Sequence, residues 1–314
     1  MIEQPLPDID AWIAFISKTD LPVLRHSVSE LERLRENADN ANGRVLAGIV
    51  LHDPLLTLRI LAYIEAHRRQ RQTTDITTID RAIMMIGITP FFRDFQNLPV
   101  VEDQLKAHPQ ALLGLLKAIT RARQAAHWAR DWAILRRDVD VDEITLATLL
   151  HDVAELVMWL FAPRLALQVG TAQLAQPQQR SAVLQEETYG VPLYQLKLAL
   201  AKTWRLPPLL ALLLDHRQEE NPRVRNVKLA VDLARHAANG WNNPALPDDF
   251  KGIRDLLHVN QETLVRRLDV DEATAQALLT LTESESRADS REGSEQAAPA
   301  GFNPAERNAA DPLQ

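Results

Sequence analysis

The 314-residue chain contains no cysteine. This absence excludes a disulfide framework, a thiolate metal site and a cysteine nucleophile. Glycine occupies only 10 positions, and no segment alternates apolar and polar residues in the manner of a half-buried strand. Apolar residues instead recur at helical spacing along the chain. The sequence therefore predicts an all-α protein, a multi-helix bundle.

An excess of positive charge is also lacking. The formal net charge is −7, which argues against a general nucleic-acid-binding surface. No stretch of about 18 residues is free of charged side chains, so a membrane span is not expected. The N-terminus carries Glu3, Asp8 and Asp10, where a signal peptide would be basic and then apolar. We expect a soluble cytoplasmic protein that binds neither nucleic acid nor membrane.

What the chain does contain is one dominant apolar stretch, residues 144–163. It is apolar on nearly every side, which predicts a helix through the middle of a core, ended by Pro163. His151 and Asp152 lie halfway along it as an adjacent pair. Burying an unpaired carboxylate costs on the order of several kcal/mol. Asp152 must therefore meet a metal ion or a cationic side chain, and this choice decides whether the protein is an enzyme.

Local signals place helices on both sides of this stretch. Ser27 is predicted as the N-cap of one helix, with a glutamate at capping-box spacing. Asp53 followed by Pro54 predicts the start of another helix. Thr78 and Gly87 have the residue types expected to begin and end a third. Further helices are predicted at 110–137, near 165–174, at 193–204, from 207 to near 216, at 224–238, 253–257, 262–268 and 272–281.

The predicted organisation has five parts. The last one is poor in large apolar residues and holds seven acidic against three basic residues, so it is expected to be a disordered acidic tail. The parts are a lead segment 1–20, an N-terminal helical subdomain 20–105, a helical core 108–240, C-terminal helices 241–282 and the tail 283–314.

An ordered series of four motifs resembles the HD-related output domain, HDOD, over about residues 20 to 240. The resemblance implies an all-helical bundle related to the HD phosphohydrolases and found in bacterial signalling proteins. Many members of the family have lost metal ligands and act as signalling modules rather than enzymes. The motifs are Asp53-Pro54-Leu55, Ile79-x-x-Ala82-Ile83-x-x-Ile86-Gly87, Leu149-Leu150-His151-Asp152, and Trp204-x-Leu206-Pro207 with His216.

The resemblance also implies a metal site. Active HD proteins bind one or two divalent metals with a His, a His-Asp pair and a later Asp, and the metal activates a bound water toward a phosphorus ester. His151 and Asp152 match the central pair, and Asp232 matches the later Asp. A buried structural carboxylate is an equally good interpretation of Asp232, because alanines surround it.

The first histidine of the set is the difficulty. Arg121 stands at its position when the small-residue pattern of the long helix is aligned without a gap. His127 lies six residues on, roughly 240° around the helix, and is expected to be a half-buried packing residue. The guanidinium of Arg121 fits a carboxylate, so an ion pair with Asp152 is predicted. Lys197, one turn after Leu193, stands where many members carry a small residue.

These residues leave three functional hypotheses. The first is a non-catalytic HDOD signalling module, with a vestigial site at Arg121, His151, Asp152 and Asp232. It would bind a signalling protein in trans, or a small nucleotide, in the cleft between the 144–163 helix and the Asp232 helix, with no cofactor. Lys197 is a secondary candidate residue for this site.

The second hypothesis is a metal-dependent phosphohydrolase or phosphodiesterase. It would use Fe, Mn, Zn or Mg held by His151, Asp152 and Asp232, with His127 or His216 completing the set. His216 is otherwise expected to be a helix C-terminal cap or a solvent-facing residue. The third hypothesis is a structural adaptor that acts through the acidic tail.

Overall fold

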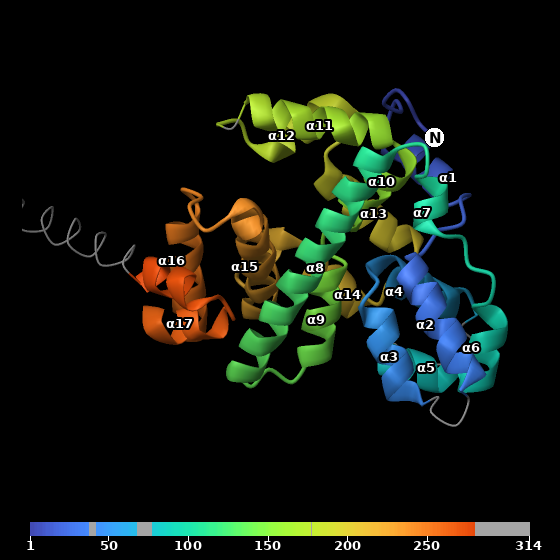
Figure 1. Cartoon of the computed structure of the whole chain (residues 1–314), viewed down its shortest axis with the longest axis horizontal. Coiled ribbons are helices and arrows are strands. Elements are labelled where there is room, and N and C mark those ends of the chain that lie inside the picture. The colour runs from blue at the N-terminus through green and yellow to red at the C-terminus, as the bar shows by residue number, and fades with distance from the viewer. Residues whose placement is uncertain (38–41, 68–76, 177, 280–314) are drawn as a thin grey trace, which may run out of the picture. The chain divides into compact units, whose positions relative to one another are not determined.

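The computed structural model describes residues 1–37, 42–67, 77–176 and 178–279 (Figure 1). These residues are helical without a strand, and the one β-type pairing among them is an isolated bridge between Val23 and Val100. The prediction of an all-α protein is therefore confirmed. The chain divides into two compact units, one spanning residues 1–260 and one beginning at Gln261. The finer division near residues 105 and 240 stays a prediction.

Seven short helices come first in the larger unit, and α2 to α6 lie together in Figure 1. Helices α3, α4 and α5 pack on one another through apolar faces. The seven are α1 (Ile9–Ile16), α2 (Arg25–Glu36), α3 (Gly43–Leu51), α4 (Pro54–Ala66), α5 (Ile79–Ile86), α6 (Ile88–Asp94) and α7 (Val101–Gln104).

Two of the predicted helix starts are confirmed, and one is wrong. Asp53 caps α4 by accepting from the backbone N–H groups of the second and third residues after it, and Thr78 caps α5, which ends before Gly87 at positive φ. Ser27 is not an N-cap, because α2 begins at Arg25. Its hydroxyl is buried and donates instead to Asp53 Oδ2 at 2.9 Å. A tertiary carboxylate thus takes the group that the local pattern assigned to capping.

The rest of the larger unit is built around α8, a 27-residue helix. It packs on α9, α10 and α15, and its buried alanines allow close approach (Figure 1). Leu51 of α3 packs on the cluster of Ala122, Ala126 and Leu149, which joins the first helices to this core. These helices are α8 (Pro109–Leu135), α9 (Val141–Leu149), α10 (Val153–Phe161), α11 (Pro163–Ala175), α12 (Ser181–Tyr189), α13 (Leu193–Thr203), α14 (Pro208–Leu214), α15 (Pro222–His236) and α16 (Leu246–Leu257), with short 3₁₀ turns η2 (His216–Gln218) and η3 (Ala237–Asn239).

The apolar stretch 144–163 was predicted to be one helix, and this prediction is wrong because the stretch forms two helices. Helix α9 ends at Leu149 and α10 begins at Val153, with His151 and Asp152 in the turn between them. Adjacent side chains on a continuous helix point about 100° apart, whereas in this turn the two side chains bond to each other. The run Val141–Phe161 is apolar and long enough to cross a membrane, but 72% of its most apolar window is buried inside the structure. It is a core segment.

The chain beyond the core begins with α16, which starts at Leu246, earlier than the predicted residue 253. The second unit contains α17 (Gln261–Arg267) and a helix over residues 272–279. The predicted tail 283–314 lies outside the described residues.

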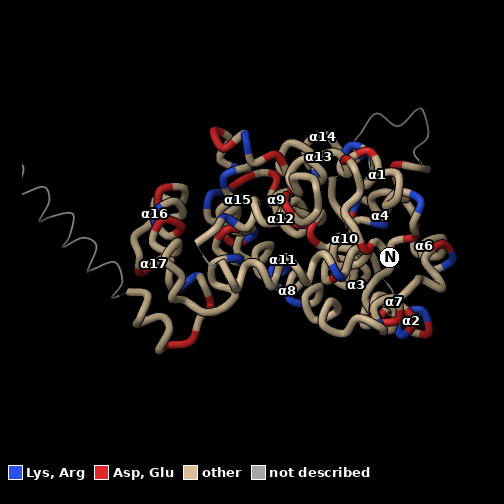
Figure 2. The backbone as a smooth tube through the Cα atoms, turned by 90° about the horizontal axis from the view of Figure 1, so that it is seen from above, with Lys and Arg blue, Asp and Glu red and all other residues tan. Residues whose placement is uncertain are grey.

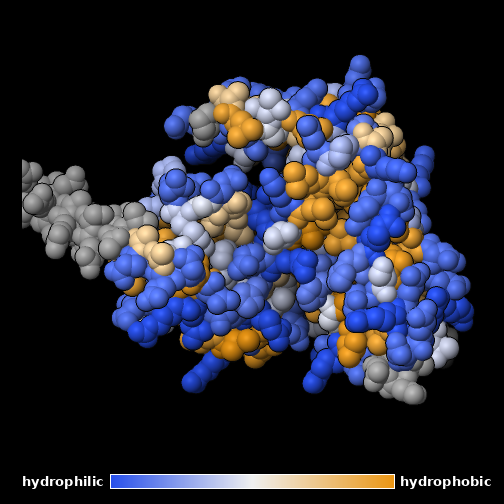
Figure 3. All heavy atoms as spheres, viewed as in Figure 1, coloured by the Kyte–Doolittle hydropathy of each residue, from blue (hydrophilic) through white to orange (hydrophobic). Residues whose placement is uncertain are grey.

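The surface seen in Figure 3 is largely hydrophilic, with a few apolar areas. The large apolar side chains that are more than half exposed include Met84, Val139 and Leu174.

Candidate functional site

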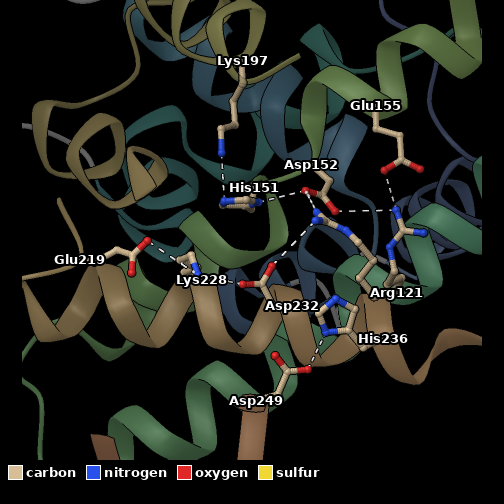
Figure 4. Close-up of polar contacts among 11 residues, drawn as sticks. Arg121, His151, Asp152, Glu155, Lys197, Glu219, Lys228, Asp232, His236 and Asp249 are labelled. Carbon is tan, nitrogen blue, oxygen red and sulfur yellow. Dashed lines mark hydrogen bonds and ion pairs between the residues drawn. The ribbon is translucent and has the colours of Figure 1, made fainter. Parts of the chain in front are cut away.

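Seven charged or polar side chains from five parts of the fold meet in the larger unit (Figure 4). We call them the charge network. The turn between α9 and α10 supplies two, α15 supplies two, and α8, α10 and α13 supply one each. They are His151 and Asp152, Asp232 and Arg235, Arg121, Glu155, and Lys197.

Asp152 is the centre of this network. Its side chain is 12% exposed. Its Oδ1 accepts from His151 Nδ1 at 2.9 Å and from Arg235 at 3.3 Å, and its Oδ2 lies 3.7 Å from Arg121 Nη2. Burial by itself raises the pKa of Asp152, but Arg235, His151 and Arg121 outweigh it and hold the pKa well below its usual value. Asp152 is therefore a carboxylate at neutral pH.

Arg121 has a closer partner than the one predicted for it. The pair with Asp152 exists at 3.7 Å, but Arg121 Nη2 donates to Glu155 Oε2 at 2.6 Å. Burial opposes the charge of Arg121, and Glu155 followed by Asp152 overcomes this effect and raises its pKa. The indole of Trp159 donates to the other oxygen of Glu155 at 3.4 Å. Arg121 therefore neutralises two carboxylates, Glu155 more closely than Asp152.

Lys197 enters the same network from α13. Its side chain is buried, with 4% of the residue exposed, and its Nζ lies 2.9 Å from His151 Nε2. Burial lowers the pKa of Lys197 to about 8, despite the attraction of Asp152. Burial and the charge of Lys197 lower the pKa of His151 to about 4, although Asp152 acts in the opposite direction. At pH 7 the lysine is an ammonium and the histidine is neutral.

Asp232 lies at the more exposed edge of the network. It pairs with Lys228 at 3.1 Å along α15 and with Arg235 at 3.8 Å. Arg235 therefore stands between two carboxylates, Asp152 and Asp232, with 39% of its side chain exposed. Basic and acidic positions are interspersed along α15 in Figure 2. Asp232 is a partner of cations on its own helix.

The two candidate histidines outside the central pair lie elsewhere. His127 is exposed, which corrects the prediction of a half-buried packing residue: it lies on the face of α8 turned away from Arg121. His216 is not the C-terminal cap of α14, because Asp215 holds that position, and it is half-buried rather than open to solvent. It begins the 3₁₀ turn η2, and its half-buried ring lies 4.1 Å from the ring of Tyr194. Among the described contacts of Asp152, neither ring takes part.

Two residues of the network were missed from the sequence, Arg235 and Glu155. A local signal existed for Arg235, because it follows Asp232 by three residues and so shares a helix face with it. Glu155 follows Asp152 by three residues, and both carboxylates reach the guanidinium of Arg121. No local pattern indicates that Glu155 is the partner of Arg121 on another helix.

The nitrogen and oxygen atoms that could ligate a divalent metal here are already engaged by other groups. The lone pair of His151 Nε2 faces the Lys197 ammonium, and both oxygens of Asp152 face guanidinium groups. Asp232 pairs with two cations of its own helix. Within the part of the chain that the structure describes, no three His, Asp or Glu side chains are arranged to hold a metal. The positive charge that a metal would supply comes from side chains.

The buried ammonium has a consequence for stability. Because the pKa of Lys197 falls from 10.5 to about 8, its charge costs the fold on the order of 3 kcal/mol at pH 7. Between pH 8 and 10.5 the unfolded chain holds this proton and the folded chain does not, so Lys197 makes the free energy of unfolding rise with pH. We expect Lys197→Met to remove that rise. At pH 7 the variant should have a free energy of unfolding about 1–2 kcal/mol higher than the native chain, because the loss of the bond to His151, about 1 kcal/mol, offsets part of the gain.

Urea unfolding at pH 7 and pH 9.5 measures both effects. Lys202→Met, an exposed position on the same helix, is the matched control and should leave the pH dependence unchanged. A Lys197→Met protein that is less stable than the native chain at pH 7 would contradict this account of the buried charge.

Comparisons with known proteins agree with this fold. The HDOD domain family profile matches residues 21–220. The MmoQ response regulator of Methylococcus capsulatus str. Bath is 20% identical, with 80% of this chain and 99% of that chain covered and a TM-score of 0.60. A virulence factor of Campylobacter jejuni subsp. jejuni is 17% identical, with 87% and 96% covered and a TM-score of 0.58. No curated protein sequence matches. Because the profile spans well over half of its length, this chain belongs to the HDOD domain family.

Proposed function

We propose that this chain is a non-catalytic signalling module that acts by binding a partner in trans. The observation that carries the proposal is the set of three cations around the His151–Asp152 pair, from Arg121, Lys197 and Arg235. Arg121 and Arg235 neutralise the carboxylate of Asp152 without a metal, and Lys197 occupies the lone pair of His151 Nε2. Membership of the HDOD family, and the name of one structural relative as a response regulator, support a role in signalling.

The partner is a signalling protein or a small nucleotide, bound between α10 and α15 at the edge of the charge network. Arg235 and Lys228 support this placement, because their side chains are 39% and 32% exposed and each can offer donors to a carboxylate or a phosphate. The deeper members of the network would position this edge. In this function the helical scaffold binds the partner. Arg121 and Lys197 replace the positive charge of a metal beside the His151–Asp152 pair.

The competing function is metal-dependent hydrolysis of a phosphorus ester. Metal analysis of the purified full chain for iron, manganese, zinc and magnesium separates the two. We expect less than about a tenth of an equivalent of each metal, because the potential metal-ligand atoms are engaged by cationic side chains. The metal content of Asp152→Asn should be the same. About one equivalent in the native protein, lost in a folded Asp152→Asn variant, would replace our proposal with the hydrolase. Folding of the variant is checked by its helical circular dichroism.

A further inference from the structure

We infer that Lys197 is a positioning residue, which holds His151 in one tautomer and ties α13 to the turn between α9 and α10. The role rests on the contacts of Lys197 within the charge network and not on the identity of the partner. It explains why a charged side chain occupies a buried position of a helix whose other buried residues are apolar. Those other residues are Leu196, Leu200 and Ala201.

The tautomer follows from donors and acceptors. A protonated lysine has three N–H donors and no acceptor. His151 Nε2, 2.9 Å from Lys197 Nζ, must therefore accept. The proton of the neutral ring is then on Nδ1, which donates to Asp152 Oδ1 at 2.9 Å. The hydrogen bond at one ring nitrogen decides the state of the other, so Lys197 and Asp152 specify the same tautomer from opposite sides of the ring.

Packing alone does not account for Lys197. A Met or Leu at this position of α13 would fill similar space without the cost of a buried charge. The ammonium also lies 5.7 Å from the ring centroid of Tyr194, one turn earlier on the same helix, within the range of a cation–π contact. Two separate contacts, with His151 and Tyr194, thus use the charge or the donors of Lys197 rather than its hydrocarbon chain.

The consequence is mechanical. The turn at residues 150–152 is held on one side by Lys197 through His151, and on the other side by Arg121 and Arg235 through Asp152. The backbone also holds the turn: Leu150 N and His151 N donate back into α9, Val153 N donates to Leu150 O, and Asp152 O accepts from Leu156 N of α10. The side-chain contacts therefore join α13, α8 and α15 at the interruption in the apolar stretch (Figure 4).

The test measures the tautomer and the mobility of the turn in the full-length protein. Imidazole ¹⁵N shifts at pH 7, with His151 assigned by a His151→Gln variant, should show a pyrrole-type Nδ1 and a hydrogen-bonded pyridine-type Nε2. In Lys197→Met we expect the Nε2 signal to lose its hydrogen-bond shift, and the amides of His151 and Val153 to exchange about tenfold faster. Lys197→Gln keeps a donor and should restore the Nε2 shift. Lys202→Met should match the native protein.

Two results would overturn the inference. One is a proton on Nε2 of His151 in the native protein, a result that does not depend on Lys197→Met and so stands even if that variant fails to fold. The other is a folded Lys197→Met whose imidazole shifts and amide exchange equal those of the native chain. Both results report the tautomer and the mobility of the turn, whereas metal analysis reports the metal, so failure here is distinguishable from failure of the proposed signalling function.

Discussion

Replacing Arg121 by leucine is expected to lower the free energy of unfolding by about 3–5 kcal/mol. The variant removes the only cation that contacts Glu155 among the described residues. The Glu155 side chain is 20% exposed and would keep a 3.4 Å bond from the Trp159 indole. A half-buried carboxylate without a cation is the costly product of this change. Asp152 suffers less, because His151 and Arg235 still contact it.

A double-mutant cycle makes the argument specific. Arg121→Leu, Glu155→Leu and the double variant are compared by urea unfolding at pH 7, with Arg123→Leu, an exposed position on α8, as the control. We expect the double variant to lose less stability than the sum of the single variants by about 2 kcal/mol or more, because it leaves no unpaired charge. Additive losses, or a loss in Arg121→Leu no larger than in Arg123→Leu, would show that the pair contributes nothing.

Local chemistry made much of the fold predictable. The N-caps at Asp53 and Thr78 and the terminator at Gly87 are properties of a few neighbouring residues, and each was identified from residue type and spacing. The small-residue pattern of the 110–137 segment includes Ala122 and Ala126, which pack with Leu149 in the core. The register of the same segment turned Arg121 toward Asp152 and His127 away from it, because 3.6 residues per turn separates the two faces.

Tertiary contacts account for what could not be predicted. Lys197 lies 46 residues from His151, and Arg235 lies 83 residues from Asp152. No pattern within one helix indicates that such residues meet. The interruption at residues 150–152 was missed because a continuous apolar run favours one helix. It is favoured in the folded protein because three helices supply partners for Asp152 and His151 there. Ser27 had the residue type of an N-cap, but its hydroxyl donates a hydrogen bond to Asp53 instead.

Asp53 carries the second large expected effect. Its side chain is fully buried and accepts four hydrogen bonds: two at the start of α4, one from Leu24 N at 2.8 Å and one from the Ser27 hydroxyl. Burial raises its pKa more than these four bonds lower it. Asp53→Ala would leave several buried donors without an acceptor, each costing about 1–3 kcal/mol. We expect a loss of about 3–5 kcal/mol in the free energy of unfolding.

The control for this prediction is Asn42→Ala. Asn42 also caps a helix, α3, but it is exposed and accepts from Val45 alone, so its loss should cost about 1 kcal/mol or less. Asp53→Asn should fall between the two, because its amide oxygen can still cap α4 while its NH₂ faces the Leu24 donor. The difference decides what Asp53 does: equal losses in Asp53→Ala and Asn42→Ala would reduce it to an ordinary cap. A larger loss in Asp53→Ala identifies Asp53 as the link between α2 and α4. This link lies two residues from Leu51, which packs on the core cluster that contains Ala122.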